Sequence, residues 1–131
     1  MARFEVLPKS RALLYLTRAQ EFAEQMDRAA SAGAWNSVGL LGVHCVISAC
    51  DSLTVAVSGQ RWSGQDHAGV YGVIRSLKLP GAETALRQIA EVLESKNRVE
   101  YEARAYTERE AEELRRSARR VLSWVVRHHS K

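Results

Sequence analysis

The chain has 131 residues, 46% of them hydrophobic and 26% charged, with a formal net charge of +4. This length suits one domain with one hydrophobic core, and the composition argues against intrinsic disorder. No apolar run of signal-peptide length begins the sequence, so we expect a cytoplasmic protein.

The first predicted helix runs from about Ser10 to Ala32. Apolar residues recur in it every three or four positions, which is the pattern of a helix with one buried face. Gly33 follows directly and is typical of a helix end, because glycine adopts the left-handed conformation at little cost.

A second helix is predicted from Asn36, a favourable N-cap, to Ser58, with Gly59 as its stop. It is apolar on nearly every side, so we expect it to be the most buried helix of the domain. Its length would also suit a membrane span, but the charge of Asp51 near its middle would be costly in lipid. We therefore interpret it as the central helix of a soluble protein with no membrane segment.

A polar loop is expected from Gly59 to Gln65, after which Asp66 caps a short helix from about His67 to Leu77. A third long helix is predicted from Ala82 to about Arg104, and Thr107 with Glu110 forms a capping box for the last helix. The predicted fold class is all-α, an up-and-down four-helix bundle with an additional short helix, in a single domain over residues 1–131.

The third long helix changes character halfway along. Its apolar stripe continues at intervals of three or four into polar positions, which either emerge into solvent or line a site. The intervals alone favour emergence into solvent, because helix ends often do so. We nevertheless predict a functional site here, facing the bundle or a dimer partner, in which Lys96→Ala and Arg98→Ala weaken anion binding. The stripe runs through Leu86, Ile89, Ala90 and Leu93 and then meets Lys96, Asn97, Glu100, Tyr101 and Arg104, with Arg98 beside them.

Asp51 is the only formal charge between Asn36 and Ser58. A buried charge needs a partner, so we expect an ion pair or hydrogen bond from Asp51 within the bundle. Two interpretations stay open: a structural polar network, or a carboxylate that orients a basic residue of a facing helix. The expected partners are Lys96, Asn97, Arg98 and Tyr101, or else His44.

Three further features are given structural interpretations. Arg61 and His67 have the spacing of an Arg–His catalytic pair, but loop polarity explains both residues. No group of residues has metal-ligand spacing, so we expect no metal and no cofactor. In the last helix Arg115, Arg116, Arg119 and Arg120 are interpreted as a solvated face paired with Glu112 and Glu113, and His128 and His129 as a frayed tail.

Two segments carry a resemblance to a known family. Residues 93–101 (LESKNRVEY) and 49–53 (ACDSL) resemble the HEPN superfamily of bacterial helical bundles, whose members often have an Arg-Asn-x-x-x-His motif in the third long helix. Laid on that motif, Lys96 stands at the Arg position, Asn97 matches, and Tyr101 stands at the His position. Tyrosine is a poor general base at neutral pH, and lysine lacks the guanidinium fork that grips phosphate.

The resemblance therefore implies a non-catalytic HEPN-like domain with no catalytic residue. Its expected binding residues are Lys96, Asn97, Arg98, Tyr101 and Asp51, for a nucleotide, a nucleic acid or a protein partner. It also implies a homodimer, and a toxin–antitoxin or nucleotidyltransferase pair. Two alternatives stay open: a metal-independent endoribonuclease using residues such as Arg61, His67 and Lys96, and a structural protein-interaction module whose second helix is the partner surface.

Overall fold

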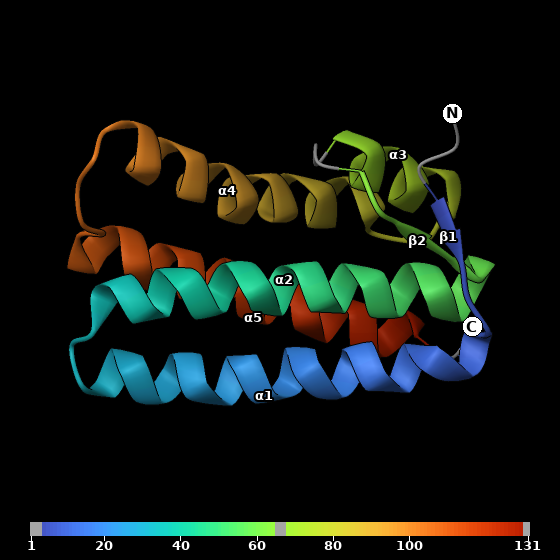
Figure 1. Ribbon diagram of the computed structural model, residues 1–131, viewed down its shortest axis with the longest axis horizontal. Helices are drawn as coiled ribbons and strands as arrows, with labels where there is room; N and C mark the ends of the chain where they lie inside the picture. Colours follow the sequence, from blue (N-terminus) through green and yellow to red (C-terminus); the bar gives the residue numbers. More distant parts are fainter. Residues whose placement is uncertain (1–3, 65–67, 130–131) are drawn as a thin grey trace.

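The computed structural model describes residues 4–64 and 68–129. Its long helices run alternately in opposite directions, so that the chain crosses the length of the molecule with each helix (Figure 1). The prediction of an all-α class is confirmed, with one small two-stranded sheet in addition. The elements in chain order are β1 (Phe4–Val6), a 3-10 turn (Lys9–Arg11), α1 (Ala12–Ser31), α2 (Trp35–Ser58), β2 (Gln60–Trp62), α3 (Ala68–Ser76), α4 (Ala82–Tyr101) and α5 (Glu108–His128).

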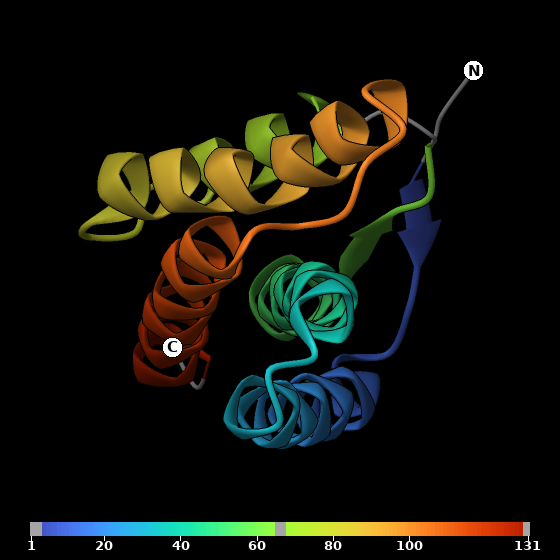
Figure 2. The ribbon, with the colours of Figure 1, turned by 90° about the vertical axis from the view of Figure 1, so that its left-hand side faces the viewer.

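Helix α2 lies at the centre of the molecule, as its apolar composition predicts. It packs against α1, α5 and α4, while the small sheet covers part of its remaining side (Figure 2). Residues on several sides of the helix are fully buried, among them Val46, Ser52 and Val55. Of the described helices, α2 is long and apolar enough to cross a membrane, but 67% of its most apolar window is buried, which is also a property of a core helix.

The ends of α2 follow the predictions only in part. Gly59 caps the C-terminus in the left-handed conformation, with φ of 70°, as expected. The prediction of Asn36 as the N-cap is wrong, because the helix already begins at Trp35 and Ala34 precedes it. The Asn36 side chain instead accepts a hydrogen bond from the Tyr106 backbone N–H at 2.9 Å, which ties the α4–α5 loop to α2.

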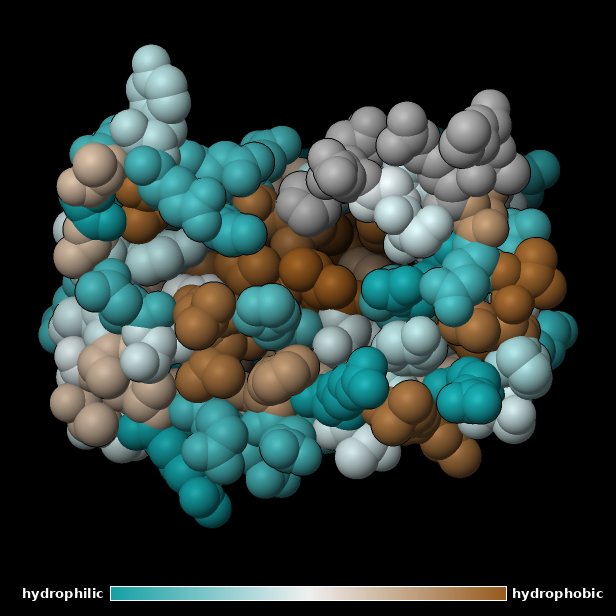
Figure 3. Space-filling model, viewed as in Figure 1, coloured by the Kyte–Doolittle hydropathy of each residue, from teal (hydrophilic) through white to brown (hydrophobic). Residues whose placement is uncertain are grey.

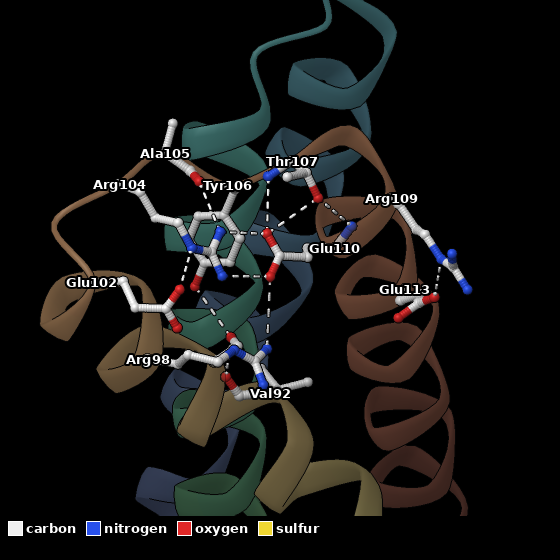
Figure 4. Close-up of polar contacts among 11 residues, drawn as sticks. Val92, Arg98, Glu102, Arg104, Ala105, Tyr106, Thr107, Arg109, Glu110 and Glu113 are labelled. Atoms are coloured by element: carbon white, nitrogen blue, oxygen red, sulfur yellow. Dashed lines mark hydrogen bonds and ion pairs between the residues drawn. The ribbon is translucent and has the colours of Figure 1, made fainter.

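The start of α5 has the predicted capping box, in which Thr107 Oγ1 accepts from the Glu110 N–H and the Glu110 carboxylate accepts from the Thr107 N–H. Arg104 adds a fork of two hydrogen bonds to Glu110, at 2.7 and 2.8 Å (Figure 4). These bonds hold the pKa of Glu110 at about 2, since the Arg104 guanidinium and the Thr107 N–H both stabilise the carboxylate. The predicted end of α4 near Arg104 is three residues late, because Arg104 already belongs to this loop.

The arginines of α5 do not form one solvated face. Arg115 and Arg119 both bind Asp27 of α1, and Arg115 also binds Glu112 within its own helix. Two opposite charges on facing helices explain this arrangement, which fastens α1 to α5. The interpretation of His128 as part of a frayed tail is also wrong, because His128 is buried with its ring centroid 5.3 Å from that of Trp124.

The loop after α2 contains a strand that the polar sequence did not indicate. Residues 60–62 pair antiparallel with residues 4–6, in a register that places Glu5 opposite Arg61. The Phe4 and Trp62 rings pack edge to face, 5.2 Å apart, and support this ribbon. The ribbon places Arg61 beside the C-terminal half of α2. The predicted start of α3, with Asp66 and His67, lies outside the described residues.

Candidate functional site

A buried ion pair joins the ribbon to α2. Arg61 Nε donates to Asp51 Oδ2 at 3.1 Å, and Arg61 Nη1 donates to Glu5 Oε2 at the same distance. The Asp51 side chain is 10% exposed and that of Arg61 is 31% exposed, so the pair lies at the edge of the core. The arrangement satisfies the charge of Asp51 with a residue only ten positions further along the chain.

Burial dominates the electrostatics of Asp51. It raises the pKa of Asp51 from 3.8 to about 6, because desolvation disfavours the carboxylate more than Arg61 stabilises it. The neighbouring charge of Glu5 raises the pKa further, and Arg18 lowers it. The group therefore changes its charge close to neutral pH. Such a carboxyl group, next to a guanidinium, is a candidate acid–base group as well as a structural one.

The Asp51–Arg61 pair borders a cavity of about 220 Å³ between α2, the ribbon, α3 and α4. The Tyr15 ring lies beneath the guanidinium, with its centroid 5.7 Å from Arg61 Cζ. Tyr71 of α3 has its pKa raised by burial and by the nearby Glu94 charge. The cavity is lined by Ile47, Cys50, Asp51, Arg61, Trp62, Ser63, Gly64, Val70 and Leu93.

The prediction that Asp51 is paired within the protein is confirmed, but every expected partner is wrong. Arg61 takes the place that we assigned to the α4 residues or to His44. His44 is exposed, and its ring instead contacts Phe22, with centroids 5.8 Å apart. Periodicity places His44 and Asp51 on one side of α2, but the ribbon covers only the end that carries Asp51.

The polar residues of α4 do not face the core. Ser95 and Val99 take the buried positions instead, because the buried face continues from Val92 at intervals of three and four. The expectation of inward-facing cations is therefore wrong in its geometry. The exposed residues here are Lys96, Asn97, Arg98, Glu100 and Tyr101. Tyr101 is 92% exposed.

Two of these residues still border a hollow. Lys96 lies 3.9 Å from Glu100, one turn along the helix, and both line a cavity of about 140 Å³ between α4 and α2. Tyr106 closes one side of this cavity, where its ring packs against Gly39. The Tyr106 hydroxyl lies 3.1 Å from the Ser95 hydroxyl. Arg98 points to the other side of α4, where it lies 3.9 Å from Glu110 (Figure 4).

The face between α2 and α4 carries exposed apolar groups. Leu40 of α2 is 56% exposed and lines the cavity with Lys96 and Glu100. Hydrophobic residues gather in the middle of this face, between the two helices (Figure 3). We call Leu40, Lys96 and Glu100 the α2–α4 face. The sequence did not indicate Leu40, because a leucine on a helix that is apolar all round gives no signal that it is exposed.

The sequence did not predict that Arg61 pairs with Asp51 and Glu5. Its spacing from His67 was noted, but its partners became visible only through the ribbon, which pairs segments more than fifty residues apart. His67 lies outside the described residues. Among residues 4–64 and 68–129, no group of three or more His, Cys, Asp or Glu side chains could hold a metal ion.

A family model described as "HEPN domain" matches residues 12–129 of the chain. The match begins at α1 and extends through α5, so it includes both the Asp51–Arg61 pair and the α2–α4 face. No curated protein and no solved structure matches the chain.

Proposed function

The chain belongs to the HEPN domain family, and from this premise we propose that it is a binding module without ribonuclease activity. In this proposal it forms a homodimer through the α2–α4 face and binds a nucleotide, a nucleic acid or a protein partner. The family points to a nucleotide-related or ribonuclease-like module, so binding and catalysis are the two functions to weigh.

The positions of the family motif carry the proposal against catalysis. Lys96 and Tyr101 replace the Arg and His of the motif, and Lys96 lies 3.9 Å from the Glu100 carboxylate. Tyr101 is 92% exposed, so the described structure does not enclose it in a site. Tyrosine is a poor general base at neutral pH, and lysine lacks the guanidinium fork of the motif's arginine.

A second copy of the chain is the occupant that fits the α2–α4 face. In a two-fold dimer each residue of a surface meets the same surface of the partner, so the face must be complementary to itself. Lys96 and Glu100 lie one helical turn apart and have opposite charges, which allows each to meet the other across such an axis. Leu40 supplies apolar surface that a dimer would remove from water.

Light scattering tests the dimer. We expect a mass near twice 14.6 kDa for the wild-type protein at micromolar concentration, and a monomer for Leu40→Glu. Leu13→Glu is the matched control, because Leu13 is 64% exposed on α1 and does not line the cavity. A monomeric wild-type protein, or equal effects of the two variants, would contradict the proposed interface.

One observation favours the endoribonuclease alternative. The cavity beside Asp51 combines a carboxyl group of raised pKa with the Arg61 guanidinium, and these are a possible base and a possible phosphate-stabilising group. We expect no cleavage of single-stranded or structured RNA by the purified protein without metal. Cleavage that Asp51→Asn or Lys96→Ala abolished would overturn the binding proposal and support the enzyme.

The nucleotidyltransferase or toxin–antitoxin partnership is proposed from the family resemblance alone. Its test is co-purification with a co-expressed nucleotidyltransferase encoded beside this chain. We expect a complex that survives size-exclusion chromatography, and separate elution would contradict the partnership.

A further inference from the structure

A second concave surface lies away from the α2–α4 face, where the C-terminal half of α5 meets the first turn of α4. It encloses about 530 Å³ and has three arginines but no carboxylate in its lining. We call it the arginine groove. It is lined by Gly81, Thr84, Ala85, Gln88, Arg119, Arg120, Ser123, Trp124 and Arg127.

Two of the three arginines have no acidic partner among the described residues. Arg120 and Arg127 are exposed and form no ion pair within the part of the chain that the structure describes. Arg119 is held by Asp27, which fixes its position at the edge of the groove. The nearest acid of α4, Glu83, pairs with Arg75 of α3 at 3.0 Å and does not line the groove.

The groove continues over the edge formed by α5. A further hollow of about 610 Å³ lies between α5 and α1 and shares Arg119, Ser123 and Arg127 with the arginine groove. Glu24 is the one carboxylate of its lining. Arg119 and Arg127 are eight residues apart, so their positions are separated by about 12 Å along the helix axis. A ligand that reaches both must be extended.

The floor of the groove is rigid. Trp124 is 4% exposed, packs on His128, and donates from Nε1 to the Pro80 carbonyl at 2.8 Å. This bond fixes α5 against the turn that precedes α4. That turn ends at Gly81, which caps α4 without a side-chain hydrogen bond, so the positive end of the helix dipole adds to the arginine charges.

We propose that the arginine groove binds the phosphate backbone of an oligonucleotide. Guanidinium groups form charge-assisted, forked hydrogen bonds with phosphate oxygens, and two of them here are free of acidic partners. An extended polyanion matches the length of the groove better than a single nucleotide does. No exposed aromatic side chain lines it for base stacking, so the binding is independent of sequence and strongly dependent on salt.

The test measures binding of a fluorescent 20-nucleotide single-stranded RNA by anisotropy between 50 and 200 mM salt. We expect the double variant Arg120→Gln/Arg127→Gln to weaken binding by roughly tenfold or more and to reduce the salt slope by about 1.4, since each contact to a single strand contributes about 0.7. The matched control is Arg28→Gln/Arg109→Gln, which removes the same charge from the last turn of α1 and the first turn of α5. These helix ends lie at the end of the molecule opposite the first turn of α4 (Figure 1). Circular dichroism checks that both double variants fold.

ATP and inorganic tripolyphosphate, tested as competitors, identify the source of the phosphate. If neither ATP nor tripolyphosphate displaces the RNA, at the concentration at which RNA itself saturates the protein, the result supports the oligonucleotide. Binding of ATP without RNA binding would overturn it, as would equal loss in the two double variants or no RNA binding at 50 mM salt. The mass of the groove variant from light scattering separates this result from the proposed dimer, because the groove shares no residue with the α2–α4 face.

Discussion

The two polar regions that interrupt the apolar pattern have opposite structural roles. Asp51 is a single charge in the most buried helix, and Arg61 of the ribbon pairs with it at the edge of the core. Residues 96–101 form a run of polar groups, and α4 presents their side chains to solvent. An isolated charge on an apolar helix thus marked a buried contact, whereas a polar run marked a surface.

The difference has a physical cause. Helix α2 is apolar on every other side, so rotating it to expose Asp51 would expose apolar residues instead. The charge therefore stays buried and needs a partner from elsewhere in the chain. A run of polar residues can be accommodated if neighbouring positions of the helix face the core instead. In α4 the buried positions are Ser95 and Val99, which leaves the polar residues in solvent. The Asp51–Arg61 pair should therefore affect stability, and the exposed end of α4 should affect binding. The following predictions test that division.

The largest effect should come from the pH dependence of Asp51. Its native pKa of about 6 exceeds its ordinary value of 3.8, so the folded protein binds the proton more tightly than the unfolded chain. The group's stabilising contribution is complete below pH 3.8 and is lost as pH rises through 6, by about 3 kcal/mol. Urea unfolding from pH 4 to 7 should show this loss in the wild-type protein and not in Asp51→Asn.

Asp27 provides the control for that experiment. Burial raises its pKa, but the hydrogen bonds from Arg119 and Arg115 outweigh burial, so the net pKa is lowered. Its contribution is therefore present above its ordinary value of 3.8 and is lost only as pH falls below that value, so Asp27→Asn should keep the wild-type slope between pH 4 and 7. Equal slopes in Asp51→Asn and the wild type would show that Asp51 does not titrate near pH 6.

Removal of Arg61 should have the next largest effect. Arg61→Met keeps the apolar stem but leaves the Asp51 carboxylate buried without its partner, which should cost about 2 kcal/mol at pH 7.5. At pH 4.5 Asp51 is protonated in the variant, so the cost should fall below about 1 kcal/mol. Unfolding free energies at the two pH values measure this, and a cost independent of pH would assign the effect to packing instead.

A smaller effect is expected where α4 ends against α2. A methyl group at Gly39 would meet the Tyr106 ring at 2.3 Å, so Gly39→Ala should destabilise the protein by about 1.5 kcal/mol. Gly72→Ala is the control, because nothing lies within 4 Å of the added methyl group and the helical position gains about 0.5 kcal/mol. Thermal unfolding of both variants should give shifts of opposite sign.

The smallest effect on stability is expected for Lys96→Met. The Lys96–Glu100 pair is half exposed and joins neighbouring turns of one helix, so its loss should change unfolding by less than about 0.5 kcal/mol. Weaker dimerisation of this variant would then reflect the interface itself. A loss of stability like that of Arg61→Met would remove the division between the two regions.

Local sequence patterns predicted the helices well, because periodicity, Gly59 and the Thr107–Glu110 capping box each act within a few residues. They predicted the candidate site less well. The Asp51 pair depends on a strand pairing of distant segments, and no local pattern marked either strand. The intervals of α4 allowed two continuations after Val92, and only packing against α2 and α5 selects Ser95 and Val99.

The ribbon also has a consequence for the order in which the chain assembles. Its two strands close a loop that contains all of α1 and all of α2, since Glu5 and Arg61 are 56 residues apart. Helices α1 and α2 can pair as neighbours through a short turn, whereas the ribbon must wait until both are in place. We therefore expect Arg61 to reach Asp51 after the two helices have paired, and a protonated Asp51 to be easier to bury before that contact forms.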